Sequence, residues 1–314
     1  MPSVGQSKEE IVYTKMLVPL DGSRTAEKVL PYARYIAAKF KIPVELLAVI
    51  DVAEFAAHIT AEKARFIDIM IEEGICSSET YLRGIASSFY NSAAVTFKVE
   101  KGRAADVIVE YGEKDRAMLI AMATHGRSGL NRFLLGSVAE KVLRATDNAL
   151  LLVRATDEAP TDGQAEFKSI IVPLDGSELA ESILPMAAGV ANKLGLEVVL
   201  FRAYHIPYNT YAGGDGLYAI NYDDLIPAVR DETNDYLEKK AAELKKLGVE
   251  NVSAVSKEGF AGDEILAIGR KTPNALIAMC SHGRSGVRRW VLGSVTENVV
   301  RHGDNPMLIF RGSF

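Results

Sequence analysis

The stretch HGRSGLNRFLLGSVAEKV at residues 125–142 returns as HGRSGVRRWVLGSVTENV at residues 282–299. Two further segments repeat in the same order, KMLVPLDGS (15–23) as KSIIVPLDGS (168–177) and KGRAADVIVEYG (101–112) as EGFAGDEILAIG (258–269). Segments that return in a fixed order indicate a duplicated structural unit. The sequence therefore predicts two homologous domains.

The seam between the two copies lies in the segment ATDEAPTDGQAEF, residues 155–167. This segment is acidic, contains Pro160 and Gly163 and has no apolar period, which is typical of a linker. We place the first domain at residues 12–155, the linker at 156–165 and the second domain at 166–314. The length of 314 residues suits two domains.

Short apolar runs alternate with helical patterns within each copy. The runs are apolar on both faces, which favours parallel strands covered by helices on both sides. The strands expected in the first copy are Met16–Leu20, Val44–Ile50, Val95–Val99, Met118–Ala123 and Leu150–Val153. Those expected in the second are Ile170–Leu174, Val198–Ala203, Val252–Val255, Leu276–Cys280 and Met307–Phe310. Five strands with helical crossovers predict a doubly wound α/β domain, a five-stranded parallel sheet flanked by helices, in each copy.

The first helical pattern of each copy contains a proline, Pro31 in one and Pro185 in the other. Apolar residues surround each proline at helical spacing. A proline inside a helix removes a backbone hydrogen bond and clashes with the preceding turn. We therefore expect a kink at both positions.

The composition limits the class of partner. The chain is 48% apolar and 25% charged, as in ordinary globular proteins, and its 36 Lys+Arg against 41 Asp+Glu give a net charge of −5. This balance argues against nucleic acid and against an anionic membrane as partners. We find neither the apolar core of a signal peptide nor the run of about 20 apolar residues that a membrane helix needs. Cys76 and Cys280 lie far apart without C-x-x-C spacing, so we predict a reduced, cytoplasmic protein.

Ligands of doubly wound sheets bind beyond the carboxyl ends of the strands, where the strand order reverses. Two motifs fall at such ends, residues 20–23 with the twin 174–177, and residues 124–129 with the twin 281–286. If the first and fourth strands are neighbours, both loops face one crevice. Asp21 and Asp175 would there contact a sugar hydroxyl or an amine. The alternative is a turn followed by a helix cap, with Ser23 and Ser177 as N-caps.

Gly136-Ser137 and its twin Gly293-Ser294 open a predicted helix. The free N–H groups and the dipole of a helix start form an anion site, and nearby glycines let backbone amides approach a phosphate. Arginines that would offset its charge, or that belong to plain surface, are Arg127, Arg132, Arg284, Arg288 and Arg289. Ser137-x-x-Glu140 and Ser294-x-x-Glu297 also match a capping box, in which the glutamate would occupy one free amide.

His125 and His282 have no second histidine or cysteine at metal-ligand spacing. A role in backbone placement or a hydrogen bond to phosphate is therefore favoured over a metal site. Neither a Ser-His-Asp order nor a G-x-S-x-G elbow occurs. We predict no catalytic residue and no metal site.

These motifs resemble the universal stress proteins over nearly the whole chain, twice. Nucleotide-binding members of that family carry G-x-x-G, nine residues, then G-[ST]. Here the frame reads Ala123-Thr-His-Gly126 with Gly136-Ser137, and Cys280-Ser-His-Gly283 with Gly293-Ser294. Both copies depart at the first glycine, where alanine adds one methyl group and cysteine is bulkier. The resemblance implies two adenine-nucleotide α-hydrolase-like domains with strand order 3-2-1-4-5 and ATP, with Mg²⁺, as the ligand.

The resemblance also implies which residues hold the nucleotide. Those around the base, the ribose and the phosphates of the first site would be Pro19, Asp21, Val49, Met122, Ala123, His125, Gly126, Gly129, Gly136, Ser137 and Val138. The matching positions of the second site are Pro173, Asp175, Ala203, Met279, Cys280, His282, Gly283, Gly286, Gly293, Ser294 and Val295.

The function implied by the resemblance is that of an ATP-binding stress-response or regulatory module without dedicated catalysis, acting on an unidentified protein partner. The alternatives are a scaffold that binds no nucleotide and a slow ATPase. The family also implies that the domains pair through residues 150–153 and 307–310 as a pseudo-dimer, with a homodimer of the chain as a further possibility. Two merely tethered domains are the alternative. The tyrosine-rich segment 204–224 is either a lid or partner surface, or a packed loop.

Overall fold

The computed structural model describes residues 13–52, 66–90, 92–124, 135–155, 161–206, 222–281 and 292–311. The first half contains β1 (Met16–Pro19), α1 (Arg24–Glu27), α2 (Leu30–Phe40), β2 (Val44–Ile50), α4 (Ile67–Ala86), β3 (Val95–Lys101), α5 (Ala104–Lys114), β4 (Leu119–Ala123), α6 (Ser137–Ala145) and β5 (Ala149–Val153). The second half contains β6 (Ser169–Pro173), α7 (Glu178–Glu181), α8 (Leu184–Leu194), β7 (Glu197–Tyr204), α9 (Tyr222–Lys246), β8 (Val252–Glu258), α10 (Ala261–Lys271), β9 (Ala275–Cys280), α11 (Ser294–His302) and β10 (Met307–Phe310).

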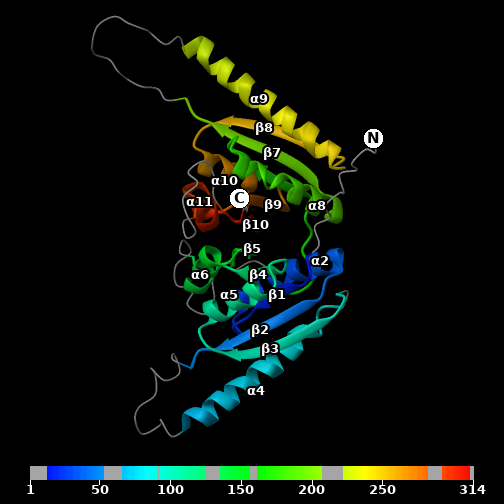
Figure 1. Cartoon of the computed structure of the whole chain (residues 1–314), viewed down its shortest axis with the longest axis vertical. Helices are drawn as coiled ribbons and strands as arrows, with labels where there is room; N and C mark the ends of the chain where they lie inside the picture. The colour runs from blue at the N-terminus through cyan, green and yellow to red at the C-terminus, as the bar shows by residue number, and fades with distance from the viewer. Residues whose placement is uncertain are drawn as a thin grey trace, which may run out of the picture.

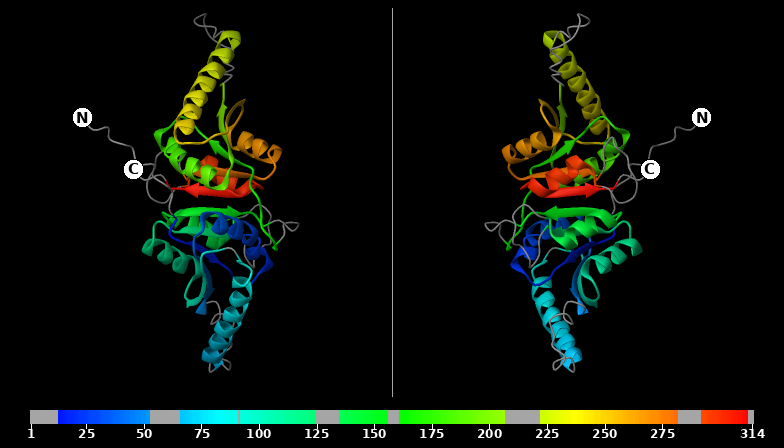
Figure 2. Two further views of the ribbon diagram at one scale, coloured as in Figure 1. Left: turned by 90° about the vertical axis from the view of Figure 1, so that its right-hand side faces the viewer. Right: turned by 90° about the vertical axis from the view of Figure 1, so that its left-hand side faces the viewer.

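All ten predicted strands are confirmed, and β2 and β10 have the predicted ends. They form one sheet in the order β3-β2-β1-β4-β5-β10-β9-β6-β7-β8, so the predicted order 3-2-1-4-5 is present in the first domain and its mirror sequence in the second. Figures 1 and 2 show an elongated molecule with α4 and α9 at opposite ends of the long axis. Every strand pair within a domain is parallel, because each crossover passes through a helix.

Two apolar layers cover the sheet. One face packs against α2, α4, α8 and α9, and the other packs against α5, α6, α10 and α11. Central strands such as β4 and β9 are buried along their whole length, as runs that are apolar on both faces predict. The core therefore fixes which helices stand beside the carboxyl ends of β4 and β9.

The predicted proline kinks are wrong. The helical pattern instead divides into two helices in each copy, and the proline is the second residue of the later helix, α2 or α8. The first N–H groups of a helix have no partner within it, so a proline there sacrifices no hydrogen bond. The chain turns before Pro31 and Pro185 rather than bending at them.

The two domains join edge to edge through β5 and β10, which confirms the predicted contact. These strands run antiparallel, with Leu151 opposite Leu308 at the centre of the pairing, and both side chains are buried. Paired arginines flank the strands: Arg154 contacts Asp304 at 3.4 Å, and Arg311 contacts Asp147 at 3.1 Å. Each arginine crosses the domain boundary in the same way, so the contact has a pseudo-twofold arrangement.

Arg34 of α2 holds the segment that leads into the second domain. Arg34 is only 7% exposed, and its guanidinium donates hydrogen bonds to Ser88 Oγ and to the carbonyl oxygens of Thr161 and Gly163, each at 3.0 Å. Phe167, further along, packs against tyrosine rings of the same helix. The described part of the connection, residues 161–167, is thus held against the first domain.

None of the helices in the described part of the chain combines the length and the apolar character that a membrane span requires.

Candidate functional site

The turn after β1 is built from Asp21, Gly22 and Ser23. Asp21 Oδ1 accepts hydrogen bonds from the backbone N–H of Ser23 at 2.9 Å and from its hydroxyl at 2.6 Å. Ser23 Oγ in turn accepts from the backbone N–H of Ala26 at 3.1 Å, which confirms Ser23 as the N-cap of α1. Gly22 has φ +80°, a left-handed conformation that favours glycine. The turn therefore aims the Asp21 carboxylate with a local hydrogen-bond frame.

The second copy repeats this turn at Asp175, Gly176 and Ser177. The same three hydrogen bonds measure 2.9, 2.6 and 3.1 Å, and Gly176 has φ +83°. Ser177 is confirmed as the N-cap of α7. The alternative of a turn followed by a helix cap is thus confirmed in both domains, with Oδ1 of each aspartate as the acceptor within the turn.

The strands that end at the strand-end turn and at the glycine loop are neighbours in the sheet, as predicted. β1 pairs with β4, with Met16 opposite Leu119, and β6 pairs with β9, with Ser169 opposite Ala275. The pairs are parallel, so the carboxyl ends of both strands point the same way. Each domain has its topological switch point at this pair, where doubly wound folds bind ligands.

A backbone hydrogen bond ties the start of α6 to the end of β4. The N–H of Gly136 donates to the carbonyl oxygen of Thr124 at 2.8 Å, and the N–H of Thr124 donates to that of Val153 at 2.9 Å. In the second domain, the N–H of Gly293 donates in the same way to the carbonyl oxygen of Ser281 at 2.8 Å. We call the hydrogen bonds from Gly136 to Thr124 and from Gly293 to Ser281 the neck hydrogen bonds. The N-terminus of each helix is therefore fixed beside the carboxyl end of the central strand.

The capping boxes that the sequence pattern left open are not formed. Gly136 and Gly293 are the N-caps, and no side chain among the described residues caps α6 or α11. Ser137 is consequently the first residue of its helix and Glu140 the fourth, one position too late for the box. The neck hydrogen bond accounts for the shift, because it holds each glycine outside the helix. Glutamate side chains do not occupy the first amides.

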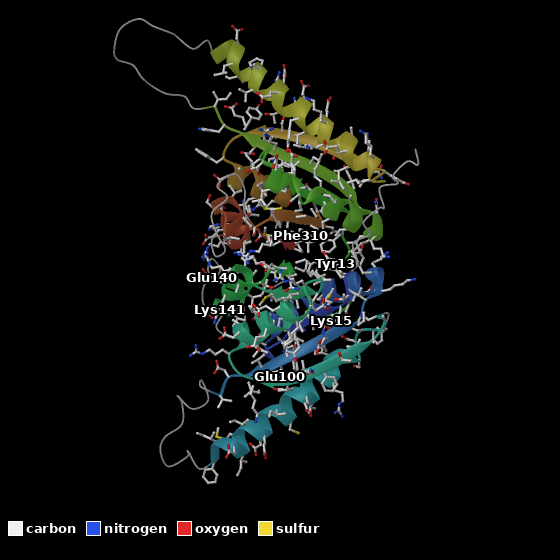
Figure 3. The ribbon with its side chains drawn as sticks, viewed as in Figure 1. Tyr13, Lys15, Glu100, Glu140, Lys141 and Phe310 are labelled. Atoms are coloured by element: carbon white, nitrogen blue, oxygen red, sulfur yellow. The ribbon has the colours of Figure 1, made fainter. Side chains whose placement is uncertain are left out.

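The glutamates instead join arginines across the domain boundary. Glu140 Oε1 lies 3.1 Å from Arg144 Nη2 of its own helix and 3.4 Å from Arg301 Nη2 of α11. Glu297 Oε1 lies 2.8 Å from Arg301 Nη2 and 3.4 Å from Arg144 Nη2. We call these four side chains the charge ring. Lys141 beside it is paired with Asp106 of α5, and Figure 3 labels Glu140 and Lys141 on α6.

Three of the apolar residues predicted for the first site share one face of the sheet. Met122 lies in the buried cluster on the α5 and α6 side, and Val49 and Val138 pack against that cluster. Their twins Met279, Ala203 and Val295 have the same placement. Pro19 and Pro173 are the last residues of β1 and β6. The structure thus brings these three apolar residues together in each domain, whereas Cys280 lies in the cluster on the other face of the sheet.

Cys280 makes contacts that Ala123, its twin, lacks. Its thiol donates to the carbonyl oxygen of Leu179 at 3.2 Å and lies 3.6 Å from Ser182 Oγ, so it faces α7. Burial raises the pKa of the Cys280 thiol. The carbonyl oxygen of Cys280 accepts from Thr296 Oγ1 at 2.9 Å. The sequence pattern did not identify Thr296 as a contact of this strand. The signal was present, because the repeat SVTENV has a threonine where SVAEKV has Ala139.

The remaining predicted site residues lie outside the described residues, namely His125, Gly126, Gly129, His282, Gly283 and Gly286, together with arginines 127, 132, 284, 288 and 289. Most of the tyrosine-rich segment, residues 207–221, lies outside them as well. Within the described part of the chain, no group of three or more His, Cys, Asp or Glu side chains could hold a metal ion.

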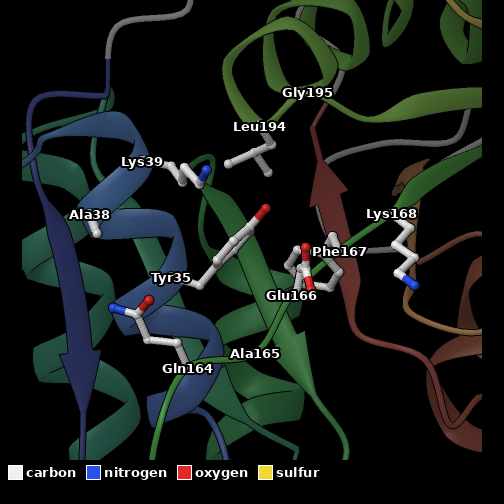
Figure 4. A pocket seen from close by; sticks show the side chains of 10 residues that line it. All are labelled: Tyr35, Ala38, Lys39, Gln164, Ala165, Glu166, Phe167, Lys168, Leu194 and Gly195. Atoms are coloured by element: carbon white, nitrogen blue, oxygen red, sulfur yellow. The ribbon is translucent and has the colours of Figure 1, made fainter.

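A separate hollow of about 570 Å³ lies between the end of α2, the segment 164–168 and the end of α8. Figure 4 shows Tyr35 and Lys39 of α2 on one side and Leu194 of α8 on another. None of the predicted site residues that the structure describes lines it. The hollow belongs to the domain junction and not to either strand-end crevice.

Comparison with known proteins gives a consistent family. The sequence profile of the universal stress protein family matches residues 13–154 and again residues 166–311. A universal stress protein of Methanocaldococcus jannaschii is 31% identical over 145 residues, 46% of this chain and 84% of that protein. A universal stress protein of Mycolicibacterium smegmatis is 20% identical over 303 residues, 94% of this chain and 96% of that protein.

The fold also has a counterpart among solved structures. The crystal structure of a universal stress protein from Archaeoglobus fulgidus superposes with a TM-score of 0.67 at 24% identity, covering 96% of this chain and 98% of that one. At this level of identity, the likeness concerns the fold alone.

Proposed function

Because this chain belongs to the universal stress protein family, whose profile matches both of its halves, we propose that it is a regulatory adenine-nucleotide-binding protein with one site per domain. The observation that carries the proposal is the glycine-capped helix start, fixed beside the carboxyl end of the central strand in both copies. Such a start presents N–H groups and the positive end of the helix dipole to an anion.

The phosphates of MgATP would lie at the starts of α6 and α11. Ser137 and Ser294 are the first residues of these helices, so their hydroxyls belong to the first turn, where a helix provides no partner for its N–H groups. The departure from capping-box geometry supports this proposal, because the first-turn amides are not taken by Glu140 or Glu297. The proposed phosphate residues of the loops are His125, Gly126, Gly129, His282, Gly283 and Gly286.

The base and ribose would lie against the strand ends. Asp21 would accept a hydrogen bond from a sugar hydroxyl or an exocyclic amine, and Pro19, Val49 and Met122 would supply apolar contact. Pro173, Asp175, Ala203 and Met279 would do the same in the second domain. The hydrogen-bond frame from Ser23 or Ser177 supports this role, since it fixes one carboxylate oxygen and thereby orients the other.

The second domain is included because of the direction of the Cys280 side chain. Its thiol contacts α7, whereas α11 packs on the opposite face of the sheet. The bulk of the cysteine is therefore directed away from the start of α11. We propose that both domains bind nucleotide and that occupancy changes contacts with a protein partner in the cytoplasm, without dedicated catalysis.

Substitution of the N-cap glycines tests this proposal. In Gly136→Ser, the new hydroxyl would accept hydrogen bonds from the amides of the second or third helical residue, as N-cap serines do. Stability should change by only a few tenths of a kcal/mol, because glycine and serine differ little as N-caps. Binding of MgATP should weaken roughly tenfold or more, because hydroxyl and phosphate compete for the same amides.

Gly293→Ser is the matched variant for the second domain. Calorimetric titration should show two sites of full affinity in the unaltered chain and only one in either variant. If both variants bind MgATP as tightly as the unaltered chain, the helix starts are not the phosphate sites.

A further inference from the structure

We propose that each phosphate site is supported by an arginine of the other domain, Arg301 for the site at α6 and Arg144 for the site at α11. The inference rests on the nucleotide-binding proposal and names a further determinant of its affinity. Neither arginine would touch the nucleotide. Each would act by neutralising a glutamate that stands behind the helix start.

The charge ring closes across the domain boundary with alternating sign. Its four contacts run from Glu140 to Arg144 (3.1 Å), Glu297 (3.4 Å), Arg301 (2.8 Å) and back to Glu140 (3.4 Å). Each glutamate therefore has one arginine from its own helix and one from the other domain. An isolated domain would retain only the first of these.

The ring stands close to both proposed phosphate positions. Glu140 is the fourth residue of α6 and Glu297 the fourth residue of α11. A helix rises 1.5 Å per residue, so each carboxylate lies on the order of 10 Å from an anion at the start of its helix. At that position, an unneutralised glutamate repels a phosphate and offsets the positive potential at the start of the helix.

The side chains of the ring are only 24–35% exposed. Their charges are consequently less screened by water and salt than those of a fully exposed pair. Lys141, the other cation on this part of α6, is paired with Asp106 within the first domain. Among the described residues of the second domain, the cation that contacts this part of α6 is Arg301.

The expected size of the effect follows from Coulomb's law. Two unit charges about 10 Å apart in water change an equilibrium constant roughly twofold. A MgATP complex with about two net negative charges should therefore lose roughly two- to fourfold in affinity when Arg301 becomes neutral, at low ionic strength. Removal of the Glu140 charge should raise affinity by a similar factor. A merely structural contribution of the ring would not give opposite signs.

The experiment is a calorimetric titration of the full chain with MgATP at about 20 mM ionic strength, in a Gly293→Ser background so that the first site is read alone. Arg301→Gln should weaken binding roughly two- to fourfold, Glu140→Gln should strengthen it, and Arg301→Lys should restore the original affinity. Adenosine, which carries no phosphate, should bind equally to all of them.

The matched control is Arg311→Gln. Arg311 also crosses the boundary to α6, but it contacts Thr146 and Asp147 at the far end of that helix, so its loss should weaken MgATP binding clearly less than the loss of Arg301 does. The proposal is overturned if Arg301→Gln binds MgATP like the unaltered chain, or if adenosine weakens in parallel. Failure of the unaltered chain to bind MgATP would refute the nucleotide proposal itself, and this inference with it.

Discussion

Replacing Arg34 with alanine should release the segment that connects the two domains. The guanidinium is buried and donates three hydrogen bonds of 3.0 Å, two of them to carbonyl oxygens of residues 161 and 163. The equivalent position of α8 is Ala188, which is also buried, so the repeat itself shows that alanine fits this place in the helix. The substitution therefore removes the contacts without disturbing helix geometry.

The magnitude follows from the contacts that are lost. A hydrogen bond to a charged group contributes about 1.5–3 kcal/mol, but water can reach carbonyl groups that the guanidinium leaves. The cation also lies 5.6 Å from the ring centre of Phe89, a contact of about 0.5–1 kcal/mol. Burial lowers the pKa of Arg34, which means that desolvation of the charge opposes these gains. We expect a net loss of about 2–4 kcal/mol in the free energy of unfolding.

Urea-induced unfolding followed by far-ultraviolet circular dichroism measures this loss. Arg83→Ala is the control, because Arg83 also lies over a phenylalanine ring, Phe97 at 5.8 Å, but is exposed. Its loss should be below about 0.5 kcal/mol, as for surface substitutions in general. The reasoning is refuted if Arg34→Ala loses no more stability than Arg83→Ala.

Three further predictions follow from packing and burial. Leu151→Asp places a charge at the buried centre of the domain contact and should lower the free energy of unfolding by about 3 kcal/mol or more. Leu247 is exposed, so Leu247→Asp should change that free energy by no more than about 0.5 kcal/mol. Urea-induced unfolding of both variants measures the difference. Gly112→Ala should destabilise the protein, because the new Cβ would lie 2.2 Å from Asn148 Oδ1. In Gly84→Ala, within α4, the new Cβ meets nothing within 4 Å, so the substitution should stabilise the protein by about 0.5–1 kcal/mol. Thermal unfolding of both variants measures the two effects. Exposed Cys76 should react rapidly with a disulfide reagent at pH 8 and buried Cys280 only on unfolding, since burial raises the pKa of Cys280; equal rates for the two thiols would contradict this. Because the folded state raises that pKa, any stability that the neutral thiol contributes is present below the pKa of the unfolded thiol and is lost as the pH rises above it.

The strands were predictable because sequence and burial follow the same pattern. Runs such as 118–123 and 276–280 are apolar on both faces, as expected of strands in a sheet that helices cover on both sides. The duplication then predicted the second domain from the first. The family resemblance, rather than periodicity, indicated that 150–153 would face 307–310.

The errors occurred where one residue satisfies two local rules. Pro31 fits a kinked helix or the first turn of a new one, and only the turn that precedes it decides. Ser137-x-x-Glu140 fits a capping box, but the neck hydrogen bond from Gly136 to Thr124 moves the helix start by one residue. That bond joins residues on either side of a loop, so the spacing within the helix does not reveal it.

The charge ring and the Arg34 contacts depend on the placement of the domains. The i,i+4 spacing of Glu140 with Arg144, and of Glu297 with Arg301, is visible in the sequence and predicts pairs within each helix. Their connection across the boundary requires the β5–β10 pairing. Arg34 interrupts the apolar face of its helix, whereas the equivalent residue of the second copy is Ala188, and this difference indicates a special role for Arg34. Two of its acceptors are backbone carbonyl oxygens, which a side-chain pattern cannot identify.

The most direct test of nucleotide binding is a calorimetric titration of the nucleotide-free chain with MgATP, read for stoichiometry. The account predicts two sites per chain, one of which is lost in Gly136→Ser and the other in Gly293→Ser. The absence of binding at millimolar MgATP would contradict it.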